Sequence, residues 1–214
     1  MQTPDTRTRL VLTAMQLFRE KGYGSTSVAD LLQTARVNSG SLYHFFPGKQ
    51  DLLLAVLEAY HQGIQPLLLE PAWRGVGDPI ERVFALLATY RQALITTDCQ
   101  YACPIGSLAL ELHEPDPPVR ARLAANFAAW VDAVHQCLVE TGARLPRELD
   151  RRELAIFVLT TMEGGVMLAR TFRDIGRFDA AVRQLRSHFD ALTRQASPRR
   201  GTHIRIPARP KERK

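Results

Sequence analysis

The sequence has few cysteines, no long apolar run and almost none of the alternation that is typical of β-strands. Its 214 residues include three cysteines, Cys99, Cys103 and Cys137. So small and odd a number does not build a disulfide framework, and it suits a reducing compartment. The longest apolar runs, such as Leu52–Leu57, span six residues, whereas a membrane span needs about 20. We therefore expect no transmembrane helix and no membrane partner.

The arrangements of residues that support catalysis are missing as well. No nucleophile is paired with a base, no Gly-rich loop suits a phosphate, and no cluster of His, Cys, Asp or Glu has metal-ligand spacing. Residues 1–5 lack the basic and apolar segments of a signal peptide. The sequence thus predicts a cytoplasmic protein that is not an enzyme and needs no metal or cofactor.

Excess positive charge is absent from most of the chain. The formal charge is +6, and residues 197–214 alone carry seven Lys or Arg and one Glu. The basic balance therefore comes from this tail, in which three prolines and few aliphatic residues predict disorder. Residues 1–50 hold six basic and three acidic side chains, a modest excess that is compatible with DNA contact.

What the sequence does have is apolar residues at helical spacing along almost its whole length. The expected fold is all-α, with a three-helix head joined by a fourth helix to a C-terminal bundle. Helices are expected at 6–21, 28–35, 39–45, 50–63, 78–96, 104–113, 119–141, 151–173 and 179–194. Breaks are expected at Gly63 to Pro66, 71–77, 115–118, 142–146 and Gly176. The chain then divides into a head (1–50), a body (51–196) and a tail (197–214).

Residues 27–46 have the pattern of a helix-turn-helix, in which a bracing helix precedes one that enters the major groove of DNA. Ser27 and Asp30 are placed to form a capping box for the first helix, and Asn38 is a suitable N-cap for the second. The apolar positions predicted to face inward are Val28, Leu31, Val37, Leu42 and Phe46. The positions left facing outward are Ser39, Gly40, Ser41, Tyr43 and His44.

Two segments of the head carry specific motifs: FREKGYGSTSVADL at 18–31 and VNSGSLYHFFPGKQDLL at 37–53. Both resemble the N-terminal domain of the TetR family of bacterial transcriptional regulators. The resemblance runs without a gap over residues 6–60, and beyond residue 65 it is limited to helical architecture. It implies that Thr26 and Ser27 open the bracing helix where hydroxyl and backbone N–H groups meet a phosphate. It also implies that Lys49 clamps a phosphate. For Thr26, simple capping is the alternative.

The second helix of the motif is the expected reader of DNA sequence. The resemblance places Ser39, Gly40 and Ser41 nearest the base edges, while Tyr43 and His44 approach the backbone or the bases. Ser39 departs from the family, which often has Lys or Arg there, so a bidentate contact to guanine is lost. Specificity then rests on other contacts or on DNA shape. A packing role for Tyr43 and an inert surface position for His44 are the alternatives.

The resemblance also implies that the body binds a small molecule and forms a two-fold dimer. The helix expected at 151–173 is apolar on two sides and contains Gly164 and Gly165, which close backbone approach would explain. We expect a homodimer through the last two helices, because two heads then read a palindrome. A purely intrachain core is the alternative. The residues of the last helix that form a seam suited to helix packing are Phe178, Val182, Leu185, Phe189 and Leu192.

Apolar side chains of the body are candidates for lining a ligand cavity. They are Phe84, Tyr90, Phe127, Trp130, Val134, Met162 and Met167. The polar candidates for orienting a ligand are Arg91, His135 and Glu163. For each apolar candidate the alternative is a place in the core.

Cys103 precedes Pro104 at an expected helix start, where the helix dipole would lower the pKa of the thiol. The segment CPIGSLA at 103–109 is similar to one in TetR-type regulators of the LmrA/YxaF-like group and in relatives that sense electrophiles. Cys103 is therefore a candidate sensor thiol, and a packing role is the alternative.

Together these features predict a sequence-specific transcriptional regulator that binds a palindromic operator on double-stranded DNA. The expected mechanism is that of a repressor, released when a small apolar or electrophilic effector binds the body. The alternatives are an architectural DNA-binding protein without an effector, a thiol-based sensor acting through Cys103, and a binding or catalytic bundle that keeps the head as a scaffold.

Overall fold

The computed structural model describes residues 4–196, and the tail predicted to be disordered lies outside them. Within these residues the fold is all-α, as predicted, and contains no strand. Its elements are α1 (Thr6–Lys21), α2 (Val28–Ala35), α3 (Ser39–Phe45), α4 (Lys49–Gly63), the π-helix η1 (Ile64–Leu69), α5 (Glu70–Trp73), α6 (Pro79–Thr96), α7 (Pro104–Glu111), α8 (Pro117–Glu140), the 3-10 turn η2 (Gly142–Arg144), α9 (Arg151–Phe172) and α10 (Ile175–Ala196).

Side-chain caps define where the three helices of the head begin. The carboxylate of Asp5 accepts a hydrogen bond from the N–H of Thr8 at 2.9 Å. Ser27 and Asp30 form the predicted capping box, and Oδ1 of Asn38 accepts from the N–H of Ser41 at 2.8 Å. Each cap satisfies a backbone donor that a helix start leaves without a partner. Each of these caps joins residues three positions apart, so it can be predicted from the local sequence. The predicted bounds of α1, α2 and α3 match the structure.

Two of the predicted helix breaks are wrong. Helical structure does not end between Gly63 and Pro66 but continues as η1 and α5. The wider π-helical turn accommodates the proline, which lacks an N–H. Gly176 does not interrupt α10 either. Its N–H donates to Oδ1 of Asp174 at 2.8 Å, so an acceptor lies at the start of the helix.

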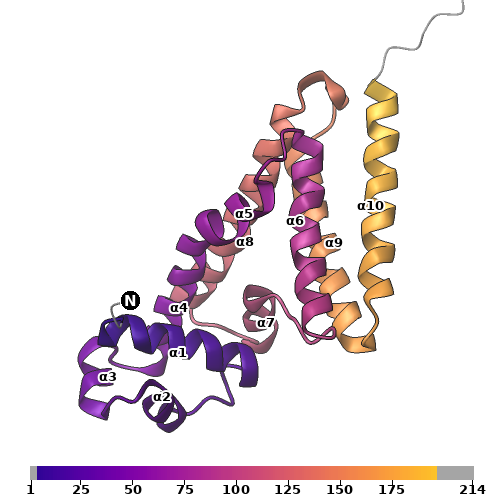
Figure 1. Ribbon diagram of the computed structural model, residues 1–214. Coiled ribbons are helices and arrows are strands. Elements are labelled where there is room, and N and C mark those ends of the chain that lie inside the picture. The colour runs from indigo at the N-terminus through magenta and orange to yellow at the C-terminus, as the bar shows by residue number, and fades with distance from the viewer. Residues whose placement is uncertain (1–3, 197–214) are drawn as a thin grey trace, which may run out of the picture.

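The head lies at one end of the molecule, and α6, α8, α9 and α10 form the body, with α10 along its outer side (Figure 1). The apolar core of the head does not stop at α4, because Ile105 and Leu108 of α7 and Leu123 of α8 belong to the same buried cluster. The head and the body therefore share packing through α4, α7 and α8.

The apolar seam of α10 faces inward, so its interpretation as a dimer contact is wrong. Phe178, Leu185, Phe189 and Leu192 are buried in the core that α10 shares with α6 and α9. A Cβ at Gly165 of α9 would lie 2.9 Å from Cδ2 of Phe178. The close approach expected at this glycine therefore occurs within one chain.

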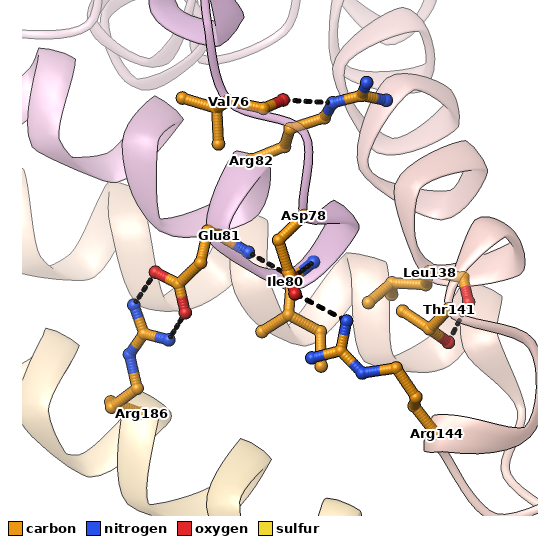
Figure 2. A network of polar contacts seen from close by, with 9 residues as sticks. All are labelled: Val76, Asp78, Ile80, Glu81, Arg82, Leu138, Thr141, Arg144 and Arg186. Atoms are coloured by element: carbon orange, nitrogen blue, oxygen red, sulfur yellow. Dashed lines mark hydrogen bonds and ion pairs between the residues drawn. The ribbon is translucent and has the colours of Figure 1, made fainter.

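Ion pairs join the elements at the end of the body that lies far from the head. Figure 2 shows Asp78 capping α6 through the N–H groups of Ile80 and Glu81 while it also accepts from Arg144 at 2.6 Å. Glu81 forms two hydrogen bonds with Arg186, at 2.5 and 2.8 Å. The start of α6 is thus joined to the segment after α8 and to α10.

Two helical stretches, Lys49–Trp73 and Arg151–Phe172, are long and apolar enough to cross a membrane when judged by length and composition alone. Polar residues interrupt both stretches, so neither contains an apolar run longer than six residues. In the fold, α4 packs on α1 and α8, and α9 packs on α8 and α10.

Candidate nucleic-acid interface and ligand cavity

Helix α3 presents a polar and aromatic face to solvent. Ser39, Gly40 and His44 are exposed, Ser41 is half-buried, and Tyr43 is 52% exposed. The opposite side is anchored by the buried side chains of Leu42 and Phe46. Small residues and hydroxyl groups on a short, firmly anchored helix are suited to close approach to a duplex and to hydrogen bonds with phosphate oxygens.

The two residues predicted to meet a phosphate at the start of α2 have different surroundings in the structure. Thr26 is completely buried, and its hydroxyl donates to the carbonyl of Gly22 at 2.7 Å. A phosphate contact by this hydroxyl is therefore wrong, and Thr26 does not cap α2 either, because the N-cap is Ser27. Ser27 is exposed, and its hydroxyl donates to Oδ2 of Asp30 at 2.7 Å.

Lys49 is the first residue of α4 and is half-buried. Its ammonium donates to the carbonyl of Tyr23 at 2.5 Å and lies 4.2 Å from the centre of the Tyr23 ring. Burial lowers the pKa of this ammonium group. Lys49 thus holds the turn between α1 and α2, and any contact with a phosphate would come in addition to that role.

A cavity of about 250 Å³ lies where α1 and α4 meet the helices of the body. Four of the predicted ligand contacts, Tyr90, Phe127, Trp130 and Glu163, line it, and so does Cys103. Further lining residues, which the sequence analysis did not single out for this role, are Met15, Ala59, Tyr60, Gly63, Ile64, Leu67, Leu68, Tyr101, Pro104, Ile105, Asn126 and Leu159.

The other predicted ligand contacts do not line this cavity. The ring of Phe84 lies 5.3 Å from that of Phe189 in the core, and Val134 and Met162 are completely buried in the same core. Met167 is 50% exposed on α9. Arg91 points to α10, where it forms two hydrogen bonds with Asp179, at 2.7 and 2.9 Å. These five assignments are therefore wrong for this cavity, and His135 does not line it either.

Asn126 is the polar lining residue that sequence reasoning missed. It lies four residues before Trp130 on α8, so both residues share the apolar face of that helix. A single amide side chain on an apolar face is the sequence feature that could have indicated a polar group in the cavity wall. Its Nδ2 donates to the carbonyls of Leu57 and Arg122, at 3.0 and 2.9 Å. Its Oδ1 is buried and has no hydrogen-bond partner among the described residues.

Glu163 and Cys103 form a pair at the wall of the cavity. The charge of the Glu163 carboxylate helps to raise the pKa of the Cys103 thiol beside it, and burial raises the pKa of Glu163. Oε1 of Glu163 is buried without a partner in the part of the chain that the structure describes. The carboxylate has room because residue 106 is glycine, where a Cβ would collide with Oε2.

The expectation of a low thiol pKa at Cys103 is wrong. Burial, and then the charge of Glu163, raise the pKa of this thiol well above its ordinary value. The N-terminal end of α7 does not compensate for these two effects. Cys103 thus stays protonated at neutral pH, which does not favour a nucleophilic role.

Helix α7 connects the cavity to the head. Its first residues, Pro104 and Ile105, line the cavity. Its last residue, Glu111, accepts hydrogen bonds from the N–H of Tyr23 at 2.9 Å and from the N–H of Gly24 at 2.6 Å. We call this contact the Glu111 clamp. It joins the end of α7 to the turn between α1 and α2, the same turn that Lys49 holds.

Helix α9 carries an apolar stripe that is open to solvent in the described chain. It consists of Ile156, Phe157, Met167, Leu168 and Phe172, each more than 40% exposed. A Cβ at Gly164, in the middle of the helix, would meet nothing within 4 Å. Large exposed apolar side chains around a small residue are typical of an interface between helices.

Comparisons with known proteins agree with this architecture. Residues 10–56 match the model of the family described as bacterial regulatory proteins, tetR family. Residues 79–184 match the C-terminal domain described as transcriptional regulator LmrA/YxaF-like.

Individual relatives match over most of the chain. An uncharacterized HTH-type transcriptional regulator of Mycobacterium tuberculosis is 36% identical over 192 residues, which cover 87% of this chain and 94% of the relative. The HTH-type transcriptional repressor DhaR of a Mycobacterium species is 29% identical, over 78% of this chain and 84% of the relative. The crystal structure of a regulatory protein TetR from Rhodobacter sphaeroides superposes with a TM-score of 0.77 at 26% identity, over 86% of this chain and 98% of that one.

Proposed function

This chain belongs to the TetR family of bacterial transcriptional regulators, which bind DNA and are not enzymes, and we propose that it is a homodimeric repressor of a palindromic operator. In this proposal, a small effector that enters the 250 Å³ cavity releases the protein from DNA. The observation that carries the proposal is the position of that cavity, between the helices that hold the head and those of the body.

The DNA-binding part of the proposal rests on α3. We assign base and backbone contacts to Ser39, Gly40, Ser41, Tyr43 and His44, because four of them are exposed on this helix and Ser41 is half-buried. Ser27 and Lys49 flank it and are assigned phosphate contacts, with Lys49 also holding the turn at Tyr23. With no Lys or Arg at position 39, part of the sequence preference would come from DNA shape.

The exposed stripe of α9 supports a dimer formed through the last two helices. Gly164 would let the α9 helices of two subunits approach each other closely, and the stripe supplies apolar area on both sides of it. Such a dimer places two heads on successive major grooves, about 34–36 Å apart. A two-fold arrangement of heads accounts for a palindromic site.

Release would act through α4 and α7. Tyr60 of α4 and Ile105 of α7 both line the cavity, and both helices also contact the head. A ligand that favours another position of α7 would move the Glu111 clamp and with it the turn before α2. The change in the free energy of operator binding then cannot exceed the difference in the free energy of ligand binding between the two arrangements.

The proposed division of labour follows the predicted domains. The head (1–50) reads DNA, and the body (51–196) binds the effector and the second subunit. The protein would work in the cytoplasm, where the chromosome is. The raised pKa of Cys103 argues against thiol-based sensing as the main mechanism.

The experiment that tests the proposal is selection of DNA from a random-sequence pool by the purified protein. We expect an enriched palindrome with half-sites about 10 base pairs apart, or a multiple of that distance. A chain that ends at residue 196 should enrich the same sequence. If nothing is enriched and binding simply fades as salt rises, the protein is an architectural DNA binder and the proposal fails.

A further inference from the structure

The polar groups of the cavity wall point to a particular class of ligand. Among the lining residues there is no Lys, Arg or His, and Glu163 is the one acid. Asn126 is 3% exposed, and its Oδ1 has no partner within residues 4–196. Oε1 of Glu163 is likewise buried and without a partner there. Buried acceptors without a donor are rare and costly, so both oxygens are poised to accept hydrogen bonds from a ligand.

Aromatic rings line the same cavity as these two acceptors. Tyr60, Tyr90, Tyr101, Phe127 and Trp130 all line the same cavity. The ring faces of Trp and Tyr attract cations, most strongly where water is excluded. The indole N–H of Trp130 already donates to the hydroxyl of Tyr90 at 3.0 Å, so it is not available to a ligand.

Size limits the apolar part of the ligand. An engineered apolar cavity of about 150 Å³ admits benzene, and this cavity measures about 250 Å³. It therefore suits one ring with a short chain rather than a large multi-ring compound.

We propose that the cavity binds an organic cation, a protonated amine on a small apolar body, with its N–H groups directed at Glu163 and Asn126. The inference rests on the proposed function, because this ligand would be the effector of the regulator. An ammonium group supplies several donors and a positive charge. It can therefore donate to both acceptor oxygens and at the same time balance the charge of the Glu163 carboxylate.

Other ligand charges fit the wall less well. An anionic ligand would meet Glu163 with no cation to balance it. Arg19 lies near enough to favour ionisation of Tyr60 and Tyr101, yet it is not among the groups that shift the pKa of Glu163. A neutral alcohol offers a single donor and leaves one of the two buried oxygens without a partner.

Three probes of matched shape test the charge preference: 4-phenylbutylamine, 4-phenylbutan-1-ol and 4-phenylbutyrate. Binding to the free protein is measured at pH 7.5 by the fluorescence of Trp130 in a Trp73→Phe background, since the chain has two tryptophans. Calorimetry provides a second readout. We expect the amine to bind at least about tenfold more tightly than the alcohol, and the alcohol more tightly than the carboxylate.

Two variants locate the preference. Glu163→Gln keeps the size of the side chain and removes its charge, so the amine should lose its advantage over the alcohol while the alcohol still binds. Glu114→Gln removes a charge from an exposed residue after α7 and should leave all three affinities unchanged. Circular dichroism and thermal melting show whether each variant is folded.

The outcomes separate this inference from the proposed function. Equal binding of amine and alcohol, tightest binding of the carboxylate, or a preference that survives Glu163→Gln in a folded protein overturns the inference. If the amine binds as expected but does not release the selected operator, the inference stands and the release mechanism fails. If another small molecule releases the operator and the amine does not bind, only the inference fails.

Discussion

At the scale of single residues, Tyr43 is the largest side chain that α3 leaves to solvent. Because it is 52% exposed, its removal should change the free energy of unfolding by no more than about 0.5 kcal/mol. We expect Tyr43→Ala to weaken binding to the selected operator at least about tenfold, since one good groove contact contributes roughly 1–3 kcal/mol. Fluorescence anisotropy with labelled operator measures this.

Tyr43→Phe is the matched control, because it keeps the ring and removes the hydroxyl. If the phenylalanine variant binds like the parent, the ring makes the contact; if it binds like the alanine variant, the hydroxyl does. Operator affinity that is unchanged in Tyr43→Ala would contradict the assigned role.

The pair of Cys103 and Glu163 gives a second residue-scale prediction. In a Cys99→Ala, Cys137→Ala background, alkylation of native Cys103 by iodoacetamide at pH 8 should be at least about tenfold slower than in the urea-unfolded chain, because the folded protein raises the pKa of the thiol. Glu163→Gln removes a negative charge that contributes to this rise. The pKa of Cys103 then falls, and alkylation accelerates.

Mass spectrometry of the alkylated chain follows both rates. A native Cys103 that reacts faster than the unfolded thiol would restore the hypothesis of a sensor thiol. If native Cys103 reacts equally fast with and without the Glu163→Gln substitution, access to the thiol, and not the charge beside it, governs the reaction.

At the scale of elements, α7 connects the cavity to the head, because its first residues line the cavity and its last residue, Glu111, binds the turn between α1 and α2. The two hydrogen bonds of the Glu111 clamp protect the N–H groups of Tyr23 and Gly24. We expect Glu111→Ala to raise hydrogen exchange at these two amides at least about tenfold, with little change in the core of α6. Exchange measured by NMR tests this, and Glu114→Ala is the control. Unchanged exchange at both amides would show that the clamp does not hold the turn.

The elements also show where sequence reasoning succeeds. The bounds of α1, α2 and α3 are predictable because Asp5, Ser27 and Asn38 act within three residues of themselves. The helical structure of residues 64–73 was not predicted, because Gly63 and Pro66 are typical of a helix end. In the structure, Gly63 directly precedes the π-helix η1 and Pro66 lies within it.

The cavity was only partly predictable for a related reason. Spacing on α8 correctly groups Phe127 with Trp130, but the face of a helix does not say where along it a cavity ends, so Val134 falls into the core. Arg91 was misplaced because its partner, Asp179, is 88 residues away in the sequence. Long-range pairing of this kind leaves no local pattern.

At the scale of the whole molecule, the exposed stripe of α9 predicts the oligomeric state. Leu168→Glu places a charge within the proposed dimer contact, and Leu168 is 43% exposed in one chain, so folding should persist. We expect the mass in solution to fall to that of one chain, 24.0 kDa. Affinity for the palindrome should fall with it, because burying an unpaired charge opposes association.

Light scattering coupled to size exclusion measures the mass. Val139→Glu, at a residue of α8 that is 46% exposed outside the stripe, is the control and should remain a dimer. A Leu168→Glu protein that stays dimeric would rule out this face as the interface.

The Glu111 clamp grips main-chain N–H groups rather than side chains. The clamp therefore depends on the backbone conformation of the head. Residue 22 has a φ of 86°, which favours glycine, and residue 24 must be small, because a Cβ there would lie 3.1 Å from Oε1 of Glu111. The recognition surface of α3 is free of this requirement. Because the exposed residues of α3 take part neither in this clamp nor in the apolar core that the head shares with α7 and α8, they can be changed to read another operator without redesigning the joint. The chemical signal and the gene it controls then become separable parts.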